Sequence, residues 1–137
     1  MDPELKARVE SQRYKEQKIL EILDDLLREE DILACMVARR GLEGIMPPRD
    51  RFKIKDMGIW STLEKTMDEF FEIISRYSEY NLDKVYFELE GYDVIFFILF
   101  EDFALVLVVP ALANRGLLEV EMENARRNIF KIMGRYK

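Results

Sequence analysis

Histidine is absent from this sequence of 137 residues, and cysteine occurs once. Without histidine, the chain has neither the usual general base near neutral pH nor the commonest metal ligand in proteins. The single thiol, Cys35, lies within an apolar run, which predicts a buried and inert side chain. Because one cysteine cannot form a disulfide within the chain, we expect a reducing, cytoplasmic compartment.

Long apolar runs are also missing. The longest, residues 94–100, is much shorter than the roughly 20 residues that a membrane-spanning helix needs, so we expect no membrane insertion. Asp and Glu number 27 against 21 Lys and Arg. This mild acidic excess gives no general attraction to nucleic acid, which is therefore disfavoured as a partner.

The motifs that carry common chemistry are not found either. Neither GxxxxGK[ST] nor GxGxxG occurs, so no phosphate-binding loop is predicted. The serines have no histidine that could activate them as nucleophiles. Acidic clusters such as Asp24 with Asp25 lack the spacing and central glycine of a calcium loop. We expect a protein that is not an enzyme and that has no cofactor and no metal site.

A charged segment without glycine opens the chain, and residues 3–30 predict one or two helices. Apolar residues are sparse before Tyr14, whereas from Ile19 to Leu27 they recur at spacings of three and four. Only the second half of this segment must pack on a core. We therefore divide the chain into a helical extension, residues 1–14, and one folded domain, residues 15–137.

Two strands are predicted to follow this helix. Residues 32–38 are continuously apolar and end at a turn that contains glycine, which predicts a buried strand. In residues 44–55, Phe52 and Ile54 alternate with charged side chains, which predicts a second strand. Pro47 and Pro48 place this strand at a sheet edge, because proline cannot donate a hydrogen bond to a neighbouring strand.

A central helix is predicted from Asp56, which can cap it, to about Tyr80. One apolar face of this helix explains packing on a sheet. A second apolar row contains Trp60, Met67, Phe71 and Ile73. The sequence leaves open whether this second row is more core or a surface for another chain.

The remaining elements complete a sheet. Residues 82–90 alternate between apolar and polar, which predicts a half-buried strand. Residues 94–100 and 103–109 are apolar at nearly every position and predict a tight hairpin that is covered on both faces. A last helix follows, which Asn114 can cap. This order predicts an α/β fold, a three-layer α/β/α sandwich whose five-stranded antiparallel sheet has helices on both faces.

The order of elements, together with the segment Ala113-Asn114-Arg115-Gly116-Leu117-Leu118 after a strand of Leu and Val, resembles the Roadblock family of dynein light chains and their prokaryotic relatives. Family members similarly show an Asn-x-Gly turn into a helix. Asn114 can cap that helix, and Gly116 permits close approach of its first turn to the sheet. The long turn of residues 39–50, with its two prolines, and the long N-terminal extension depart from the family pattern.

The resemblance implies a non-catalytic homodimeric scaffold or regulator that binds a small Ras-like GTPase or a related signalling or motor complex. It implies pairing through the central helix and an edge strand. The residues expected at this dimer interface are Trp60, Met67, Phe71, Ile73, Val85 and Phe87. The charged outer faces of the helices at residues 15–30 and 117–136 are then the expected partner surface. A small-molecule sensor domain with the same three layers is the alternative.

Positive charge concentrates on the first hairpin, where the cations are Arg39, Arg40, Arg49, Arg51, Lys53 and Lys55. The first five of these form the candidate partner surface. Two interpretations stay open. The charges can protect a sheet edge against pairing with another chain. They can also bind an acidic partner surface or nucleic acid, which makes the hairpin a second possible partner surface.

Overall fold

The structure is a computed structural model that describes residues 2–111 and 115–134. The α-helices of these residues are α1 (Pro3–Leu27), α2 (Met57–Arg76) and α3 (Arg115–Gly134). The strands are β1 (Ala34–Arg39), β2 (Leu42–Ile45), β3 (Lys84–Leu89), β4 (Tyr92–Phe100) and β5 (Phe103–Pro110). Short 3-10 helices cover Arg49–Arg51 and Ser78–Tyr80.

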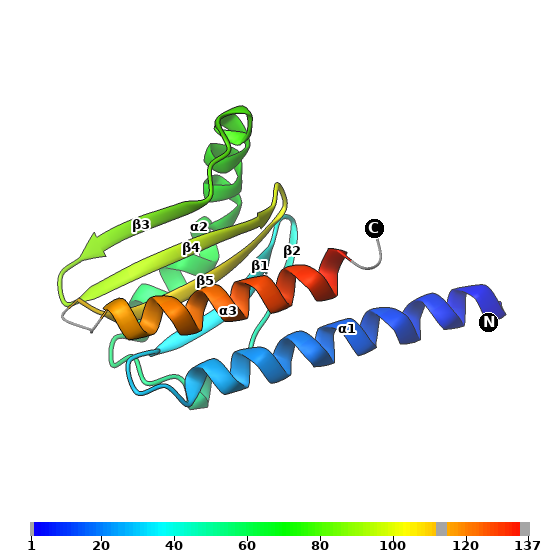
Figure 1. Cartoon of the computed structure of the whole chain (residues 1–137), viewed down its shortest axis with the longest axis horizontal. Helices are drawn as coiled ribbons and strands as arrows, with labels where there is room; N and C mark the ends of the chain where they lie inside the picture. Colours follow the sequence, from blue (N-terminus) through cyan, green and yellow to red (C-terminus); the bar gives the residue numbers. More distant parts are fainter. Residues whose placement is uncertain (1, 112–114, 135–137) are drawn as a thin grey trace.

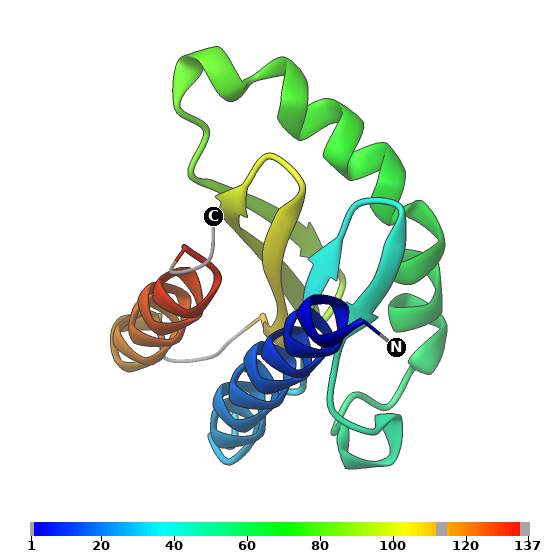
Figure 2. The same ribbon diagram turned by 90° about the vertical axis from the view of Figure 1, so that its right-hand side faces the viewer.

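The strands form one antiparallel sheet in the order β2-β1-β5-β4-β3. Helices α1 and α3 lie side by side on one face of this sheet, and α2 crosses the other face (Figures 1 and 2). The predicted three-layer α/β/α sandwich is therefore confirmed. Strands β2 and β3 are the two edges of the sheet, as expected.

The β4–β5 hairpin forms the centre of the core. It turns at Glu101 and Asp102, and its register places Ile95 opposite Leu107. Both of these side chains are fully buried. Because helices cover both faces of the sheet, a strand in its middle must be apolar at nearly every position. That requirement explains the continuous apolar runs in the sequence.

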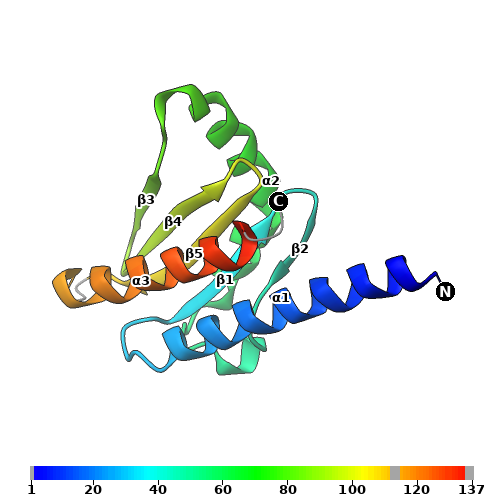
Figure 3. The same cartoon turned by 45° about the vertical axis from the view of Figure 1, so that its right-hand side comes forward.

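Helix α1 is anchored by its second half only. Ile19, Leu23, Leu26 and Leu27 are buried, whereas most side chains before residue 14 are exposed. Figure 3 shows this first half extending well beyond the sheet. The helix itself is continuous through the predicted boundary at residues 14 and 15. The division into an extension and a domain stays a prediction about folding.

The second strand differs from the prediction for residues 44–55. Strand β2 ends at Ile45, and the chain then leaves the sheet through Pro47 and Pro48, which have no N–H group to donate. Phe52 and Ile54 are buried as their alternation suggested, yet they belong to an extended segment beside the start of β1. A backbone hydrogen bond joins this segment to the residue before β1: Lys53 N donates to Leu33 O at 2.7 Å.

Helix α2 begins as predicted, because the Asp56 carboxylate accepts a hydrogen bond from Gly58 N at 2.9 Å. The helix ends at Arg76, earlier than expected, and a 3-10 turn leads to the left-handed residue Asn81 with φ 57°. Helix α3 buries Leu118, Met122, Ala125 and Ile129. Its expected cap, Asn114, lies outside the described residues.

Candidate protein-binding surfaces

A groove of about 630 Å³ lies between α2 and the edge strand β3. Its apolar lining comes from Ile59, Leu63, Phe70, Ile73, Phe87 and Leu89. Phe70 forms the floor, since its ring centroid lies 4.7 Å from that of Phe87 and 5.0 Å from that of Phe96. Ile73, at the rim, is 48% exposed. Apolar side chains that stay this open on a small domain are typical of an interaction surface.

The predicted dimer interface contains residues of two different kinds. Trp60 and Phe71 are 0% exposed and Met67 is buried with them, so these three side chains belong to the core of a single chain. The prediction that they lie at the dimer interface is therefore wrong, because they pack between α2 and the sheet and expose almost no surface to another chain. Ile73, Val85 and Phe87 keep exposed or half-exposed surface beside the groove. For these three, the interface stays a prediction.

Strand β3 has β4 on one side and no described strand on the other. The backbone groups along its outer edge therefore have no partner strand within the described residues. Such an edge can pair with another chain when no bulge or proline blocks it. Lys84 to Leu89 pair with β4 in an unbroken register, and the strand contains no proline. The groove and this edge adjoin each other and form one continuous surface.

Only Arg39 and Arg40 of the five predicted cations belong to the β1–β2 hairpin, because β2 ends at Ile45; the other three lie in the segment that follows. Three of the five contact α1. Arg39 contacts Glu16 at 3.0 Å and also donates to Glu43 O at 2.7 Å. Arg51 forms an ion pair with Asp24. Lys53 Nζ donates to the main-chain oxygens of Leu27 at 2.8 Å and Glu29 at 2.6 Å. Since Leu27 is the last residue of α1 and Glu29 lies just beyond it, Lys53 caps the negative end of that helix.

The other two cations contact α2 on the opposite face. Arg40 pairs with Glu72 at 2.6 Å, and Arg49 pairs with Glu64 at 2.6 Å. Hydrogen bonding to Glu64 raises the pKa of Arg49. All five cations of the predicted second partner surface thus contact carboxylates or carbonyls of their own chain. Their charge is largely matched, which weakens the case for an acidic partner or nucleic acid at this hairpin.

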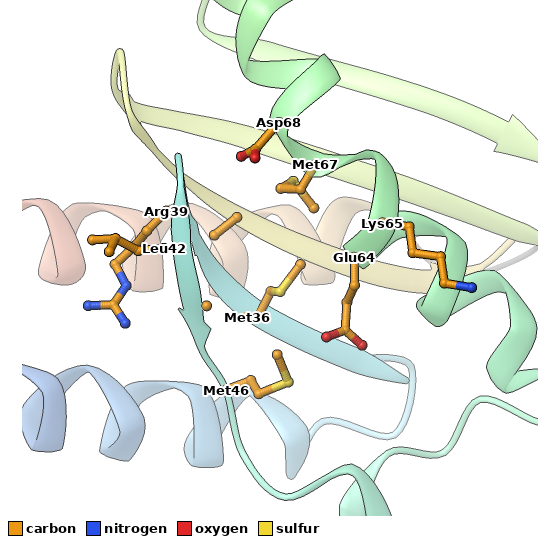
Figure 4. A pocket seen from close by; sticks show the side chains of 10 residues that line it. Met36, Arg39, Leu42, Met46, Glu64, Lys65, Met67 and Asp68 are labelled. Atoms are coloured by element: carbon orange, nitrogen blue, oxygen red, sulfur yellow. The ribbon is translucent and has the colours of Figure 1, made fainter.

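A small crevice separates this hairpin from α2, and Figure 4 shows its lining. Its volume is about 140 Å³, and Met36, Met46 and Met67 bring their thioethers toward it. A Cβ at Gly44 would lie 3.1 Å from Met36 Sδ, so only glycine fits here without a shift of the methionine. Pockets for small ligands usually measure roughly 300–1,000 Å³. This crevice is too small for the sensor alternative.

A buried carboxylate near the start of α3 was missed by the sequence analysis. Asp93, on β4, is 4% exposed and forms an ion pair with Arg115 at the first position of α3. The Arg115 guanidinium also lies 5.7 Å from the ring centroid of Tyr86 on β3. A lone Asp at the start of an apolar run is the sequence signal from which this buried carboxylate could have been predicted. The pair fixes the start of α3 against the edge of the sheet.

Chemically reactive groups are few among the described residues. No group of three or more Cys, Asp or Glu side chains in this part of the chain could hold a metal ion. Burial raises the pKa of Cys35 from 9.0 to about 12, with a further contribution from the negative charge of Asp24. No helix within residues 2–111 and 115–134 is long and apolar enough to cross a membrane.

We compared the chain with known protein families, curated sequences and solved structures. No protein-family model and no curated protein sequence matches the chain. Among solved structures, MglB from Myxococcus xanthus is similar with a TM-score of 0.66, 14% identity, and coverage of 87% of this chain and 90% of that chain. The gliding protein MglB from Thermus thermophilus gives a TM-score of 0.63, 16% identity, and coverage of 86% and 90%.

A third similar structure is named as a Roadblock/LC7 domain. The Roadblock/LC7 domain from Streptomyces avermitilis is similar with a TM-score of 0.57 and 9% identity, over 82% of this chain and 94% of that chain. Identities this low establish the arrangement of the backbone and not a shared activity. The layers, the strand order and these likenesses together give the chain the fold of a Roadblock-type domain.

Proposed function

We propose that this protein is a non-catalytic homodimeric scaffold or regulator that binds a small Ras-like GTPase or a related signalling or motor complex. The observation that carries the proposal is the apolar groove between α2 and β3, which adjoins a strand edge that no described strand pairs. A second copy that pairs at this edge extends the sheet and covers the groove in one step. The single buried thiol fits a reducing compartment, and we propose the cytoplasm.

The spacing of side chains on α2 suits a twofold axis close to Thr66. Ile59 and Ile73 are equally far along the helix from Thr66, so an antiparallel pair of α2 helices brings Ile59 of one copy against Ile73 of the other. The threonines permit close approach. Thr62 Oγ1 donates to Gly58 O and Thr66 Oγ1 donates to Thr62 O, both at 2.8 Å, which satisfies their hydroxyls within the helix.

The GTPase partner rests on the resemblance to Roadblock domains. Pairing through α2 uses one face of the sheet and leaves the outer sides of α1 and α3 available on the other (Figure 2). Those sides carry exposed charges, among them Glu21, Asp25, Arg127 and Lys131. A charged contact suits a reversible complex whose affinity falls as salt is added. This layer is the first candidate surface and the basic hairpin the second.

Capture from the native cell extract tests the partner. The immobilised full-length protein is incubated with extract that contains either a GTP analogue or GDP, and the retained proteins are identified. We expect a small GTPase that is retained in one nucleotide state, and less of it at high salt. Capture should survive Arg40→Glu combined with Arg49→Glu, two exposed cations that contact α2, if the α1 and α3 layer makes the contact. Recovery of no GTPase in either nucleotide state would refute this part of the proposal.

The groove also keeps the sensor alternative open, since about 630 Å³ is within the range of ligand pockets. Few polar groups converge there: Asp56 already caps α2, and Glu69 lies at the exposed side. Native mass spectrometry of the protein purified from its own cells separates the two. A bound small molecule of constant mass favours a sensor, whereas a dimer without added mass favours the scaffold.

A further inference from the structure

A second groove, of about 180 Å³, lies between α1 and α3, which run side by side on one face of the sheet (Figures 1 and 2). Ile22, Leu26 and Ala125 supply its apolar lining. Asp25 lines it from α1 and Glu121 from α3, and two asparagines of α3 also contribute. Among the described residues, no Lys or Arg lines this α1–α3 groove. It is separate from the groove of the proposed dimer, which lies on the other face of the sheet.

Two exposed apolar side chains extend the α1–α3 groove toward the start of α3. Leu117 is 64% exposed and lies one helical turn before Glu121. Val120 is 56% exposed and lies one turn before Asn124. Covering such open apolar side chains is favourable, because it removes their surface from water. Since both adjoin a groove, this end of α3 is a candidate docking surface.

Negative charge gathers around the same end of the groove. Residues 21–31 contain six carboxylates and one cation, Arg28, and residues 115–125 contain three carboxylates and one cation, Arg115. The helices run antiparallel, so the last turns of α1 lie beside the first half of α3 (Figures 1 and 3). A ligand in the groove therefore meets carboxylates from both helices.

The two cations of these segments leave the groove acidic. Arg115 is held by the buried Asp93 at the edge of the sheet. Arg28 contacts Asp25 at 3.3 Å, but the two side chains are 78% and 70% exposed. An ion pair this open contributes little to stability, so another cation can replace Arg28 at Asp25.

Some of the carboxylates are matched within the chain and others are not. Glu21, Asp24 and Glu123 form ion pairs with lysine or arginine side chains. Glu29 and Glu121 form no ion pair within residues 2–111 and 115–134. Lys53 contacts the main-chain oxygen of Glu29 and not its carboxylate. The unmatched carboxylates are therefore those that adjoin or line the groove.

We propose that the α1–α3 groove binds a basic segment of another protein, with one Lys or Arg side chain between Asp25 and Glu121. The aliphatic stem of that side chain lies against Leu26, and its charged head contacts the two carboxylates. Neighbouring apolar residues of the segment cover Leu117 and Val120. This inference rests on the proposed function, since the groove lies in the layer assigned to the GTPase, and it adds the chemistry of the partner's contact.

Net charge selects a basic segment over other occupants. The chain carries −6, which repels an acidic protein segment, a nucleic acid and an anionic membrane and attracts a cation. A bare metal ion lacks ligands, since no group of three or more Cys, Asp or Glu side chains within the described residues could hold one. A second copy offers Arg127 and Lys131 on α3, but it also brings the same net negative charge. A basic segment supplies positive charge and apolar cover together.

Fluorescence anisotropy with two labelled peptides tests the proposal on the full-length protein. The first peptide is a helix with leucines flanked by lysines, and the second has glutamates in place of those lysines. We expect the lysine peptide to bind at least about tenfold more tightly, with an affinity that falls as salt is added. Asp25→Lys combined with Glu121→Lys should weaken its binding about tenfold or more.

Glu79→Lys combined with Glu101→Lys is the matched control. It changes the net charge by the same amount, but its two exposed positions lie after α2 and in the β4–β5 turn. Binding of the lysine peptide should stay within about twofold of the wild type, because these positions do not line the groove. An equal loss in the two double variants would mean that the peptide responds to net charge alone, and would overturn the proposal.

Other results would also decide the matter. Equal binding of the two peptides, or no binding of the lysine peptide at millimolar concentration, removes the basic segment. A change of mass in Asp25→Lys combined with Glu121→Lys would assign the groove to contact between copies instead. Equal capture of a GTPase by the wild type and this variant would overturn the groove and leave the proposed function standing. Groove-dependent binding of the lysine peptide without capture of any GTPase would do the reverse.

Discussion

Cys35 shows how burial decides the chemistry of a single residue. The thiol lies on β1 beneath α1, fully buried, and its Sγ donates to Leu23 O at 3.5 Å. Removal from water disfavours the thiolate, and the nearby Asp24 disfavours it further, so the pKa rises from 9.0 to about 12. At neutral pH the group is a neutral, packed thiol. It therefore behaves as a small apolar side chain and not as a nucleophile.

A pH-dependent loss of stability follows from this raised pKa. Between pH 9.0 and about 12 the unfolded chain loses the thiol proton while the folded chain keeps it, so the free energy of unfolding falls as pH rises. Chemical denaturation at a series of pH values should show a smaller fall in Cys35→Ala than in the wild type. An identical fall in both proteins would mean that Cys35 does not contribute.

Phe71 and Ile73 provide a matched comparison on one helix. Phe71 is fully buried between α2 and the sheet, whereas Ile73 is largely exposed. Phe71→Ala should lower the free energy of unfolding by about 3–5 kcal/mol, because it leaves a cavity. Ile73→Ala should cost less than about 1 kcal/mol in dilute solution. Equal costs in urea denaturation at low protein concentration would contradict the placement of these side chains.

The segment between β1 and α2 connects the two helical layers, and we call it the brace. Arg51 and Lys53 connect it to α1, and Arg40 and Arg49 connect it to α2. Exposed ion pairs contribute little individually, so the brace depends more on the buried Phe52 than on its charges. Its ring packs edge-on against Trp60 with centroids 4.9 Å apart.

The contact between Lys53 and the end of α1 can be tested by substitution. Desolvation lowers its pKa, while its ammonium donates to the carbonyls that end the helix. Lys53→Met should lower the free energy of unfolding by roughly 1 kcal/mol and increase amide exchange in the last turn of α1. Lys55→Met, two residues later and exposed, is the control. Equal exchange in the two variants would mean that Lys53 does not cap the helix.

The elements that were predicted correctly have local signals. The stripe of α1, the β4–β5 hairpin and the Asp56 cap each depend on residues close together in the sequence. The end of β2 depends on where the chain leaves the sheet, which periodicity alone does not specify. The partners of the hairpin cations, such as Glu16 and Glu72, are distant in sequence and meet only in the folded chain. For the same reason, sequence could not show which apolar row of α2 packs on the sheet.

At the scale of the whole molecule, the two faces of the sheet are separate surfaces. The α2 side has an apolar groove and the outer edge of β3, which no described strand pairs, and both suit permanent contact with a second copy. The α1 and α3 side has charged helices and the projecting N-terminal half of α1, which suit reversible contacts. A dimer formed through the first side presents two copies of the second. This division is the physical basis of the scaffold function that we propose.

The mass of the protein in solution tests the central claim most directly. Light scattering at micromolar concentration should give twice the chain mass of 16.4 kDa. Ile73→Glu places a charge in the groove without touching the core and should give the mass of one chain. Leu42→Glu, at an exposed apolar residue on the opposite edge strand, should leave the dimer intact. A wild-type protein with the mass of one chain, or an Ile73→Glu variant that stays a dimer, would contradict the account.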